Sequence, residues 1–175
     1  MWKLVETTFV TLDGVIEVSD EWARPYFDDE WDGHALDLLD AADALLLGRK
    51  TYEVLADFWP GRTGPISERI NALPKHVASR TLTEATWNAT IIEGDVAEAV
   101  AKLKTQDGKN ILKFGTGELD KTLLEHGLVD EFQFWLIPIV VGRGERLFEG
   151  IETTLELLDT TRFKSGVVAL RYAPK

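Results

Sequence analysis

The sequence predicts a layered α/β domain with a mixed, mostly parallel sheet. Short apolar runs alternate with segments of helical periodicity through most of the chain, as they do in proteins with parallel sheets. The last two strand-like runs, residues 155–163 and 166–172, flank turn residues and predict a closing antiparallel hairpin. We expect a single domain over residues 1–175, which is long enough for a substantial core.

Composition and charge limit the functional classes. The chain is 45% hydrophobic and 28% charged, as in ordinary soluble globular proteins. Its formal net charge of -11 argues against a nucleic-acid partner, because such proteins concentrate basic residues on one face. The absence of cysteine excludes disulfides and thiolate chemistry. We expect a cytoplasmic protein without a membrane partner, since no signal peptide is recognisable and the most apolar segment, residues 134–141, is short.

The first strand is expected at residues 3–12, which are rich in Val, Thr and Phe. Asp13-Gly14 interrupts it before Val15 and Ile16 resume the apolar pattern. Asp-Gly between apolar runs is typical of a hairpin turn, and it also suits a strand end that bends over a ligand. The sequence leaves these two interpretations open.

An acidic and aromatic segment with Trp22 and Trp31 precedes a helical pattern through Leu36, Leu39 and Ala42. Its neighbouring carboxylates point in different directions along a helix, which favours a solvated face over a metal site. The three histidines of the chain are scattered without ligand spacing, so no metal is assigned.

Residues 44–47 form a fully apolar run that continues through Gly48-Arg49-Lys50-Thr51 into a helix, which Pro60-Gly61 ends. This pattern predicts a central parallel strand. Shorter elements follow it: a helix over 64–73, strands over 75–78 and 87–92, and an amphipathic helix over 95–104.

The segment 111–127 carries the strongest functional signal. An apolar strand over 111–114 runs through Gly115-Thr116-Gly117 into a helix with Leu119, Leu123 and Leu124 at helical spacing and Gly127 after its last turn. Small residues before a helix N-terminus allow a phosphate to approach its free N–H groups. The alternative is a tight strand-to-helix turn without a ligand.

Residues 129–141 are long and apolar, and Pro138 predicts a kinked or edge strand. Phe132, Phe134, Leu136 and Ile139 offer more apolar surface than such a strand needs, which predicts a homodimer.

Three turns follow predicted strands: 48–51, 79–81 and 115–117. The carboxyl ends of parallel strands share one edge of a sheet, so these turns are expected to line one crevice. Two of them place Arg or Lys beside a hydroxyl, which suits a phosphate monoester, and the third opens a helix, which suits a pyrophosphate. NADP has both groups. The alternative is that Arg49, Lys50 and Arg80 are ordinary surface charges.

Five motifs, taken in their order, cover nearly the whole chain: residues 11–16, 45–53, 77–82, 114–119, and 127–131 running into 138–144. On this set the sequence resembles the dihydrofolate reductase superfamily, in the branch similar to the reductase domain of bacterial riboflavin biosynthesis. The resemblance implies a three-layer α/β/α fold with a mostly parallel sheet closed by the C-terminal hairpin, and NADPH as hydride donor.

The resemblance also implies positions for the cofactor. Its phosphates lie at Gly48, Arg49, Lys50 and Thr51, and its 2′-phosphate at Ser79 and Arg80. The pyrophosphate and nicotinamide ribose lie along Phe114, Gly115, Thr116, Gly117, Glu118 and Leu119, and the nicotinamide ring lies against Leu12, Gly14 and Ile16.

On the substrate side the expectations are fewer. Protonation is assigned to Asp32 or to an ordered water, although the sequence favours Asp32 as a solvated residue of an acidic helix. Asp13 and Tyr52 are the expected substrate contacts, although the spacing of Tyr52 with Leu55 suits core packing as well.

The favoured hypothesis is an NADPH-dependent reductase of a small heterocycle, pteridine- or ribosylaminopyrimidine-like, acting as a homodimer. The alternative is a non-catalytic NADP-binding or stress-related homodimer.

Overall fold

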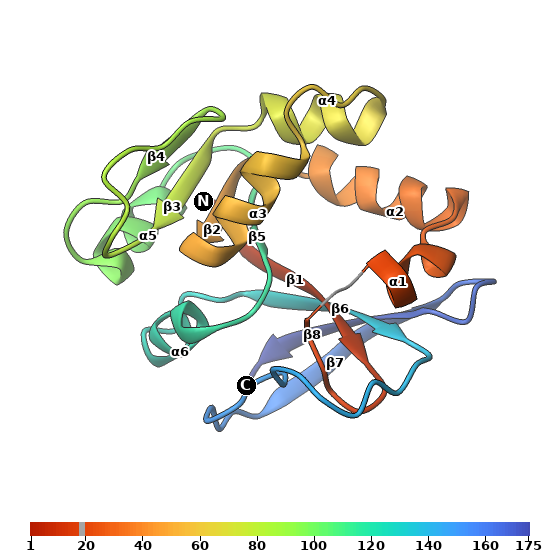
Figure 1. Ribbon diagram of the computed structural model, residues 1–175. Coiled ribbons are helices and arrows are strands. Elements are labelled where there is room, and N and C mark those ends of the chain that lie inside the picture. Colours follow the sequence, from red (N-terminus) through yellow and green to blue (C-terminus); the bar gives the residue numbers. More distant parts are fainter. Residues whose placement is uncertain (18–19) are drawn as a thin grey trace.

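The computed structural model describes residues 1–17 and 20–175, which form an eight-stranded sheet with helices on both faces (Figure 1). The strand order is β4-β3-β2-β5-β1-β6-β8-β7. The strands are β1 (Leu4–Thr11), β2 (Ala42–Gly48), β3 (Lys75–Ala78), β4 (Ala89–Ile91), β5 (Asn110–Phe114), β6 (Glu131–Ile137), β7 (Leu155–Arg162) and β8 (Val168–Pro174). The helices are α1 (Asp20–Ala23), η1 (Arg24–Tyr26), α2 (Asp29–Asp40), α3 (Arg49–Phe58), α4 (Pro65–Ala72), α5 (Val96–Lys104) and α6 (Glu118–Glu125).

The six strands from β4 to β6 are parallel, and β8 is antiparallel to both β6 and β7. The predicted mostly parallel, mixed sheet with a C-terminal hairpin is therefore confirmed. The hairpin forms one edge of an open sheet and does not close it.

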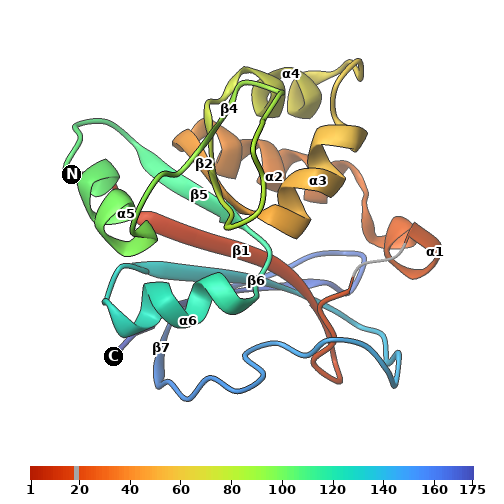
Figure 2. The same ribbon diagram turned by 60° about the vertical axis from the view of Figure 1, so that its left-hand side comes forward.

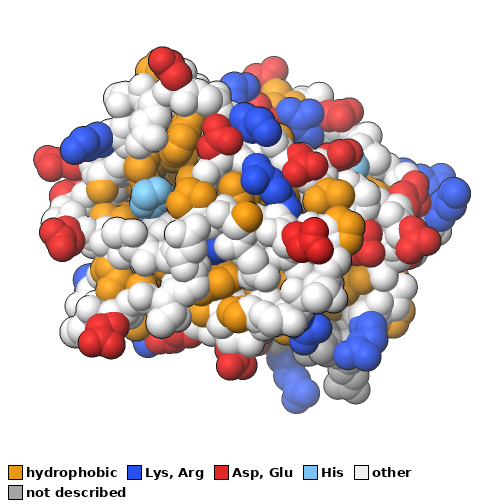
Figure 3. All heavy atoms as spheres, turned by 90° about the horizontal axis from the view of Figure 1, so that it is seen from above, with side chains coloured by type: hydrophobic (Ala, Val, Ile, Leu, Met, Phe, Trp, Pro, Cys, Tyr) orange, Lys and Arg blue, Asp and Glu red, His pale blue; other side chains and the backbone are white. Residues whose placement is uncertain are grey.

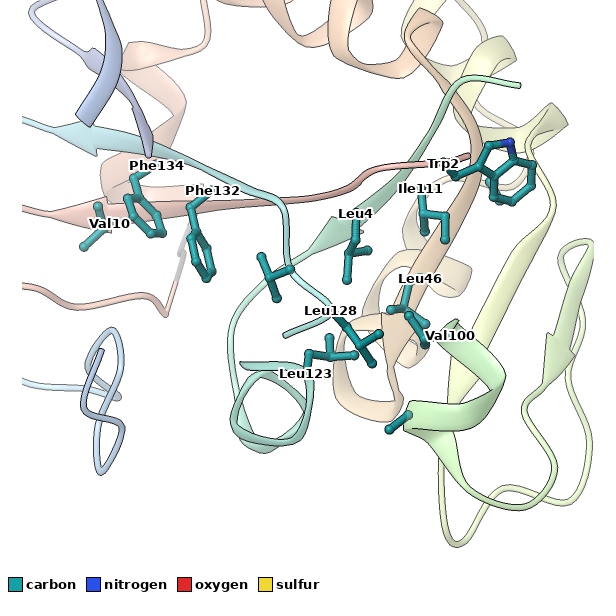
Figure 4. Packing of buried hydrophobic residues seen from close by; sticks show 13 residues of the cluster. Trp2, Leu4, Val10, Leu46, Val100, Ile111, Leu123, Leu128, Phe132 and Phe134 are labelled. Atoms are coloured by element: carbon teal, nitrogen blue, oxygen red, sulfur yellow. The ribbon is translucent and has the colours of Figure 1, made fainter. Parts of the chain in front are cut away.

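Apolar side chains attach the helices to the two faces of the sheet, which gives the three predicted layers (Figure 2). On one face α2, α3 and α4 pack against the sheet through Leu39, Tyr52 and Ile70, respectively. On the other face α5 and α6 pack against the sheet through Val100 and Leu123. The packing of α5 and α6 against β1, β2, β5 and β6 is shown in Figure 4. Because β2 is covered on both faces, its run of leucines is buried throughout.

Three expected elements differ in their bounds. The strand expected at 129–141 ends at Ile137, because Pro138 has no N–H to continue the ladder. It lies between β1 and β8, so the prediction of an edge strand is wrong. The strand expected at 87–92 is shorter, since Trp87 and Asn88 have φ angles of 59° and 53° in the left-handed region. Ala42, expected on the helix, begins β2.

Two of the aromatic residues on which the predicted dimer interface depends are buried inside the subunit. Phe132 and Phe134 are 0% and 4% exposed, because they pack under Phe148 within one subunit. These rings cannot form the expected subunit interface. The homodimer itself stays a prediction.

Lys75, the first residue of β3, is a buried cation in the core beside α4. Its ammonium donates a hydrogen bond of 3.0 Å to the Asn71 carbonyl in the last turn of α4 and lies 4.1 Å from the centre of the Trp87 ring. Among the described residues no carboxylate pairs with it. Burial lowers the pKa of Lys75 to about 8 from the ordinary 10.5.

The stability of the protein should therefore rise with pH between about 8 and 10.5. In that window the unfolded chain binds more protons than the folded chain, because the folded pKa of Lys75 is the lower one. Lys75→Met keeps the unbranched stem and removes the charge, so this rise should be lost in the variant. Urea unfolding at pH 7 and about pH 9.5 measures the difference. The exposed Lys102→Met is the control, and equal pH dependence of all three proteins contradicts the prediction.

Candidate functional site

Three turns lie together at the carboxyl edge of the parallel strands. The register pairs Leu47 with Phe114 and Gly48 with Ala78, so the residues that follow β2, β5 and β3 leave the sheet side by side. These are the turns at 48–51, 115–117 and 79–81. The prediction that they share one edge is confirmed.

The strands β2 and β5 form the topological switch point of the sheet. From β2 the chain enters α3, on the face of α2 and α4, and leads to β3. From β5 it enters α6 on the opposite face and leads to β6 (Figures 1 and 2). The first turns of α3 and α6 thus flank the crevice between these two strands, which is where open α/β sheets bind ligands.

At Gly115 two of the turns meet. Its φ of 73° lies in the left-handed region that glycine adopts without strain. A Cβ atom at this position would lie 3.0 Å from Thr51 Oγ1 in the first turn of α3. A side chain at residue 115 would be strained at this φ angle and would require the Thr51 side chain to shift slightly, so both conformation and space favour glycine.

Thr116 presents an unsatisfied polar atom in the same turn. Its Oγ1 is buried and has no hydrogen-bond partner within the described part of the chain. Buried polar atoms of this kind are rare unless water or a ligand satisfies them. The N–H groups of Glu118 and Leu119 follow in the first turn of α6, where no helical carbonyl can accept from them. The turn therefore offers a hydroxyl and backbone donors to a polar ligand.

Ser79 shapes the turn after β3. Its Oγ accepts hydrogen bonds from the amides of Thr81 and Leu82 at 3.2 and 3.0 Å. Arg80 extends toward α6 and forms an ion pair of 3.2 Å with Glu118. Both side chains are about nine-tenths exposed (90% and 92%), so this pair contributes little to stability. An incoming phosphate can replace Glu118 as the partner of Arg80.

Arg49 and Lys50 add positive charge to the first turn of α3. Arg49 pairs with Glu53 one turn further along the helix at 3.2 Å. Lys50 pairs at 3.3 Å with Glu145 in the loop after β6. The Lys50–Glu145 pair shows that the loop after β6 reaches the same edge as the three turns.

A clasp joins the loop after β1 to the loop after β6. The Asp13 carboxylate accepts hydrogen bonds from Thr11 Oγ1 at 2.6 Å, from the Gly142 amide at 2.7 Å and from the Val141 amide at 3.2 Å. The Arg146 guanidinium donates to the Asp13 carbonyl. The Thr11 hydroxyl and the Gly142 amide are the main causes that lower the pKa of Asp13 to about 2. Asp13 therefore holds these two loops together, and its expected contact with the substrate stays a prediction.

The residues expected beside the nicotinamide ring lie on this clasp. Leu12 and Ile16 donate backbone hydrogen bonds to Ile139 and Glu145, at 2.9 and 3.0 Å. Gly14 accepts from the Leu147 amide at 2.8 Å. The side chain of Leu12 is exposed, so it remains available to a ligand.

An open cavity of about 1060 Å³ lies beside the clasp. Trp22 and Tyr26 from α1 and η1 form one wall, and Ile139, Val141 and Arg143 from the loop after β6 form the other. Its volume is that of a small-molecule site, and its walls combine aromatic, aliphatic and cationic groups.

The sequence matches the RibD C-terminal domain over residues 3–169. The chain belongs to this family. A relative, the uncharacterized protein YyaP of Bacillus subtilis strain 168, is 34% identical over an alignment of 180 positions that covers 97% of this chain and 94% of YyaP. The resemblance to the riboflavin-pathway branch of the dihydrofolate reductase superfamily is confirmed.

Solved structures share the fold of this RibD C-terminal domain. A putative riboflavin biosynthesis protein from Shewanella sp. PV-4 has a TM-score of 0.75 at 22% identity, over 99% of both chains. A diaminohydroxyphosphoribosylaminopyrimidine deaminase/5-amino-6-(5-phosphoribosylamino)uracil reductase from Thermotoga maritima has a TM-score of 0.67 at 14% identity, over 99% of this chain and 57% of that one. These likenesses confirm the α/β/α architecture.

Two further residues expected at the substrate lie elsewhere in this RibD C-terminal domain. Tyr52 is buried, and its hydroxyl accepts from the Thr86 amide at 2.8 Å, which favours core packing over the expected substrate contact. Asp32 is exposed on the first turns of α2. Partial burial and the neighbouring Asp29 and Asp28 raise its pKa. Asp32 does not line the cavity beside the clasp.

Three charged residues at the turn 115–117 were not expected from the sequence. Lys113 and Asp120 contact the turn, and Glu6 contacts Lys113. A signal for two of them exists, because Glu6 and Lys113 interrupt otherwise apolar strands. A charge in such a run indicates a buried ion pair.

The described residues contain no group of three or more His, Asp or Glu side chains that could bind a metal ion. None of the described helices has the length and apolar character that a bilayer crossing requires. On the face seen in Figure 3, acidic and basic side chains are interspersed, so this face carries no continuous basic patch.

Asp13→Asn should loosen the clasp. The amide hydrogen of Gly142 should exchange about tenfold faster, because a hydrogen bond to a charged acceptor is replaced by a weaker one. In the wild type the same loosening should appear as the pH falls from about 4 to about 2, since the folded pKa of Asp13 lies below its ordinary 3.8. Hydrogen-exchange mass spectrometry or NMR measures both effects. Asp159→Asn on the exposed strand β7 is the matched control, and unchanged exchange at Gly142 in Asp13→Asn contradicts the assignment.

Proposed function

We propose that this protein is an NADPH-dependent reductase that transfers a hydride to a small heterocycle, pteridine- or ribosylaminopyrimidine-like. The observation that carries the proposal is the convergence of the three turns at the switch point, where Gly115 meets Thr51 and Arg80 meets Glu118. Membership of the RibD C-terminal domain family supports it. The Thermotoga maritima protein that shares the fold is named as a deaminase and reductase, and this name also supports the proposal.

The residues present suit a phosphorylated dinucleotide. The first turns of α3 and α6 would hold its phosphates through residues 48–51 and 115–119, and Ser79 and Arg80 would hold the 2′-phosphate. The unpartnered Thr116 Oγ1 gives such a ligand a hydroxyl to bind. The cofactor, when bound, supplies the hydride.

The cavity beside the clasp is the proposed acceptor site. It adjoins Val15, next to the residues expected at the nicotinamide ring. Trp22 and Tyr26 provide aromatic surface for a flat heterocycle, and Arg143 provides donors for its carbonyl oxygens or for an anionic group. The protein would orient the acceptor and limit its access to water. Because Asp32 does not line the cavity, an ordered water is the favoured proton donor.

The first experiment addresses the cofactor. Binding of NADPH and NADH is followed by quenching of tryptophan fluorescence. Arg80→Ala should weaken NADPH about tenfold and leave NADH unchanged, because only NADPH carries the 2′-phosphate. Arg162→Ala on β7 is the control with an equal change of charge. An equal loss of both dinucleotides in Arg80→Ala contradicts the proposed phosphate site.

The second experiment addresses turnover. Consumption of NADPH is measured with a panel of dihydropterins and ribosylaminopyrimidines. Trp22→Ala should raise the KM of the accepted heterocycle about tenfold without changing the affinity for NADPH, because the lost ring contacts only the acceptor. Val54→Ala, at an exposed position of α3, is the control. Tight binding of NADPH without turnover of any member of the panel would favour the non-catalytic NADP-binding protein.

A further inference from the structure

A trio of buried charged side chains lies next to the turn at 115–117. Glu6 comes from β1, Lys113 from β5 and Asp120 from α6, and they are 0%, 2% and 0% exposed. The Lys113 ammonium lies 2.7 Å from Asp120 Oδ1 and 3.5 Å from Glu6 Oε2. The trio is therefore a compact ionic cluster inside an otherwise apolar layer.

The trio holds both ends of the turn. Lys113 Nζ donates a hydrogen bond of 2.5 Å to the Gly115 carbonyl. Asp120 Oδ2 accepts one of 2.5 Å from the Gly117 amide. Any change in the charge of the trio must therefore act on the backbone between Gly115 and Gly117.

The charges of the trio do not balance when every member is ionised. Two carboxylates and one ammonium leave a net charge of -1 at a site without access to water, which is strongly unfavourable. The groups facing Glu6 are Lys113 from β5 and Asp120 from α6, and Phe132, its neighbour on β6, is apolar. One additional proton makes the trio neutral.

Orphaned polar atoms indicate where that proton lies. Neither oxygen of Glu6 has a hydrogen-bond partner among the described groups, and Asp120 Oδ1 has none besides its ion pair with Lys113. The two carboxyl groups lie close together, because both contact the same Lys113 ammonium. A proton on Glu6 directed at Asp120 satisfies both groups at once. The pKa of Glu6 is raised well above the usual range, mainly by burial, which agrees with a protonated acid.

We propose that Glu6 and Asp120 share one proton, and that the resulting neutral trio positions the turn at 115–117 for the phosphates of the dinucleotide. Glu6, Lys113 and Asp120 are then positioning residues, since they act through the backbone of the turn. The second half of this inference rests on the proposed NADPH site, whereas the shared proton does not. Loss of the proton would place a negative charge beside the bound phosphates and weaken their binding.

Infrared spectroscopy of the whole protein tests the proton without any ligand. Near neutral pH the wild type should show a carbonyl band of a protonated carboxylic acid that persists after exchange into heavy water. The band should be absent from Glu6→Gln and from Asp120→Asn, because one carboxylate and one ammonium already balance in each variant. It should persist in Glu131→Gln, a control whose carboxylate pairs with Lys3 and Arg171 and not with the trio. A wild type without this band, or variants that retain it, overturns the shared proton.

The affinity for NADPH, measured as the pH is raised from neutral, tests the positioning role, because burial raises the pKa of Glu6 above its ordinary value. The wild type should bind NADPH about tenfold more weakly once the proton is lost. This is the expected effect of one charge about 10 Å away at an effective dielectric constant of about 20. Glu6→Gln should lack that decline and Glu131→Gln should keep it. Urea unfolding at each pH shows whether a variant is folded.

The outcomes separate the two claims. An equal decline of affinity in the wild type and in Glu6→Gln overturns the positioning role and leaves the proposed function standing. A wild type that binds no NADPH at any pH overturns the proposed function and the positioning role together. The infrared band still decides the shared proton in that case.

Discussion

The close approach of the Gly115 backbone to Thr51 is the constraint on which the candidate site depends. It joins the first turns of two helices that lie on opposite faces of the sheet, and a Cβ at residue 115 would crowd the Thr51 side chain. Both turns follow neighbouring parallel strands, so the register of β2 and β5 determines how near they come. A crevice with two helix N-termini results from this geometry, and it suits a ligand with several phosphates.

Charges near this crevice are arranged at two levels. At the surface, Arg80 and Lys50 hold exposed partners, Glu118 and Glu145, by pairs that are weak in water and easily exchanged. Beneath the surface, Lys113 and Asp120 are fixed by burial and hydrogen bonds to the turn. The surface pairs can exchange their carboxylate partners for an anionic ligand, and the buried pair keeps the backbone of the turn in place when they do.

The substrate side is built differently, from loops and aromatic residues. Asp13 fastens the loop after β1 to the loop after β6, and the cavity lies beside this junction. In families that share a scaffold, specificity resides in such loops, while the strands beneath them stay constant. In this protein the three turns follow the strands of the scaffold, whereas the cavity proposed for the acceptor is lined mainly by loop residues and by α1 and η1.

The sequence alone determined the order of strands and helices, the glycine turns and their common edge, because hydrophobic periodicity and turn residues are local signals. It also placed Arg80 and the turn at 115–117 at one edge, since parallel strands direct their carboxyl ends the same way. Only the tertiary structure decided the roles of Tyr52, Phe132 and Phe134, because an aromatic residue at a given spacing suits a core as well as a surface. It alone brought Glu6, Lys113 and Asp120 together, since their contact joins three elements that are distant along the chain, and no local pattern reports such a distance.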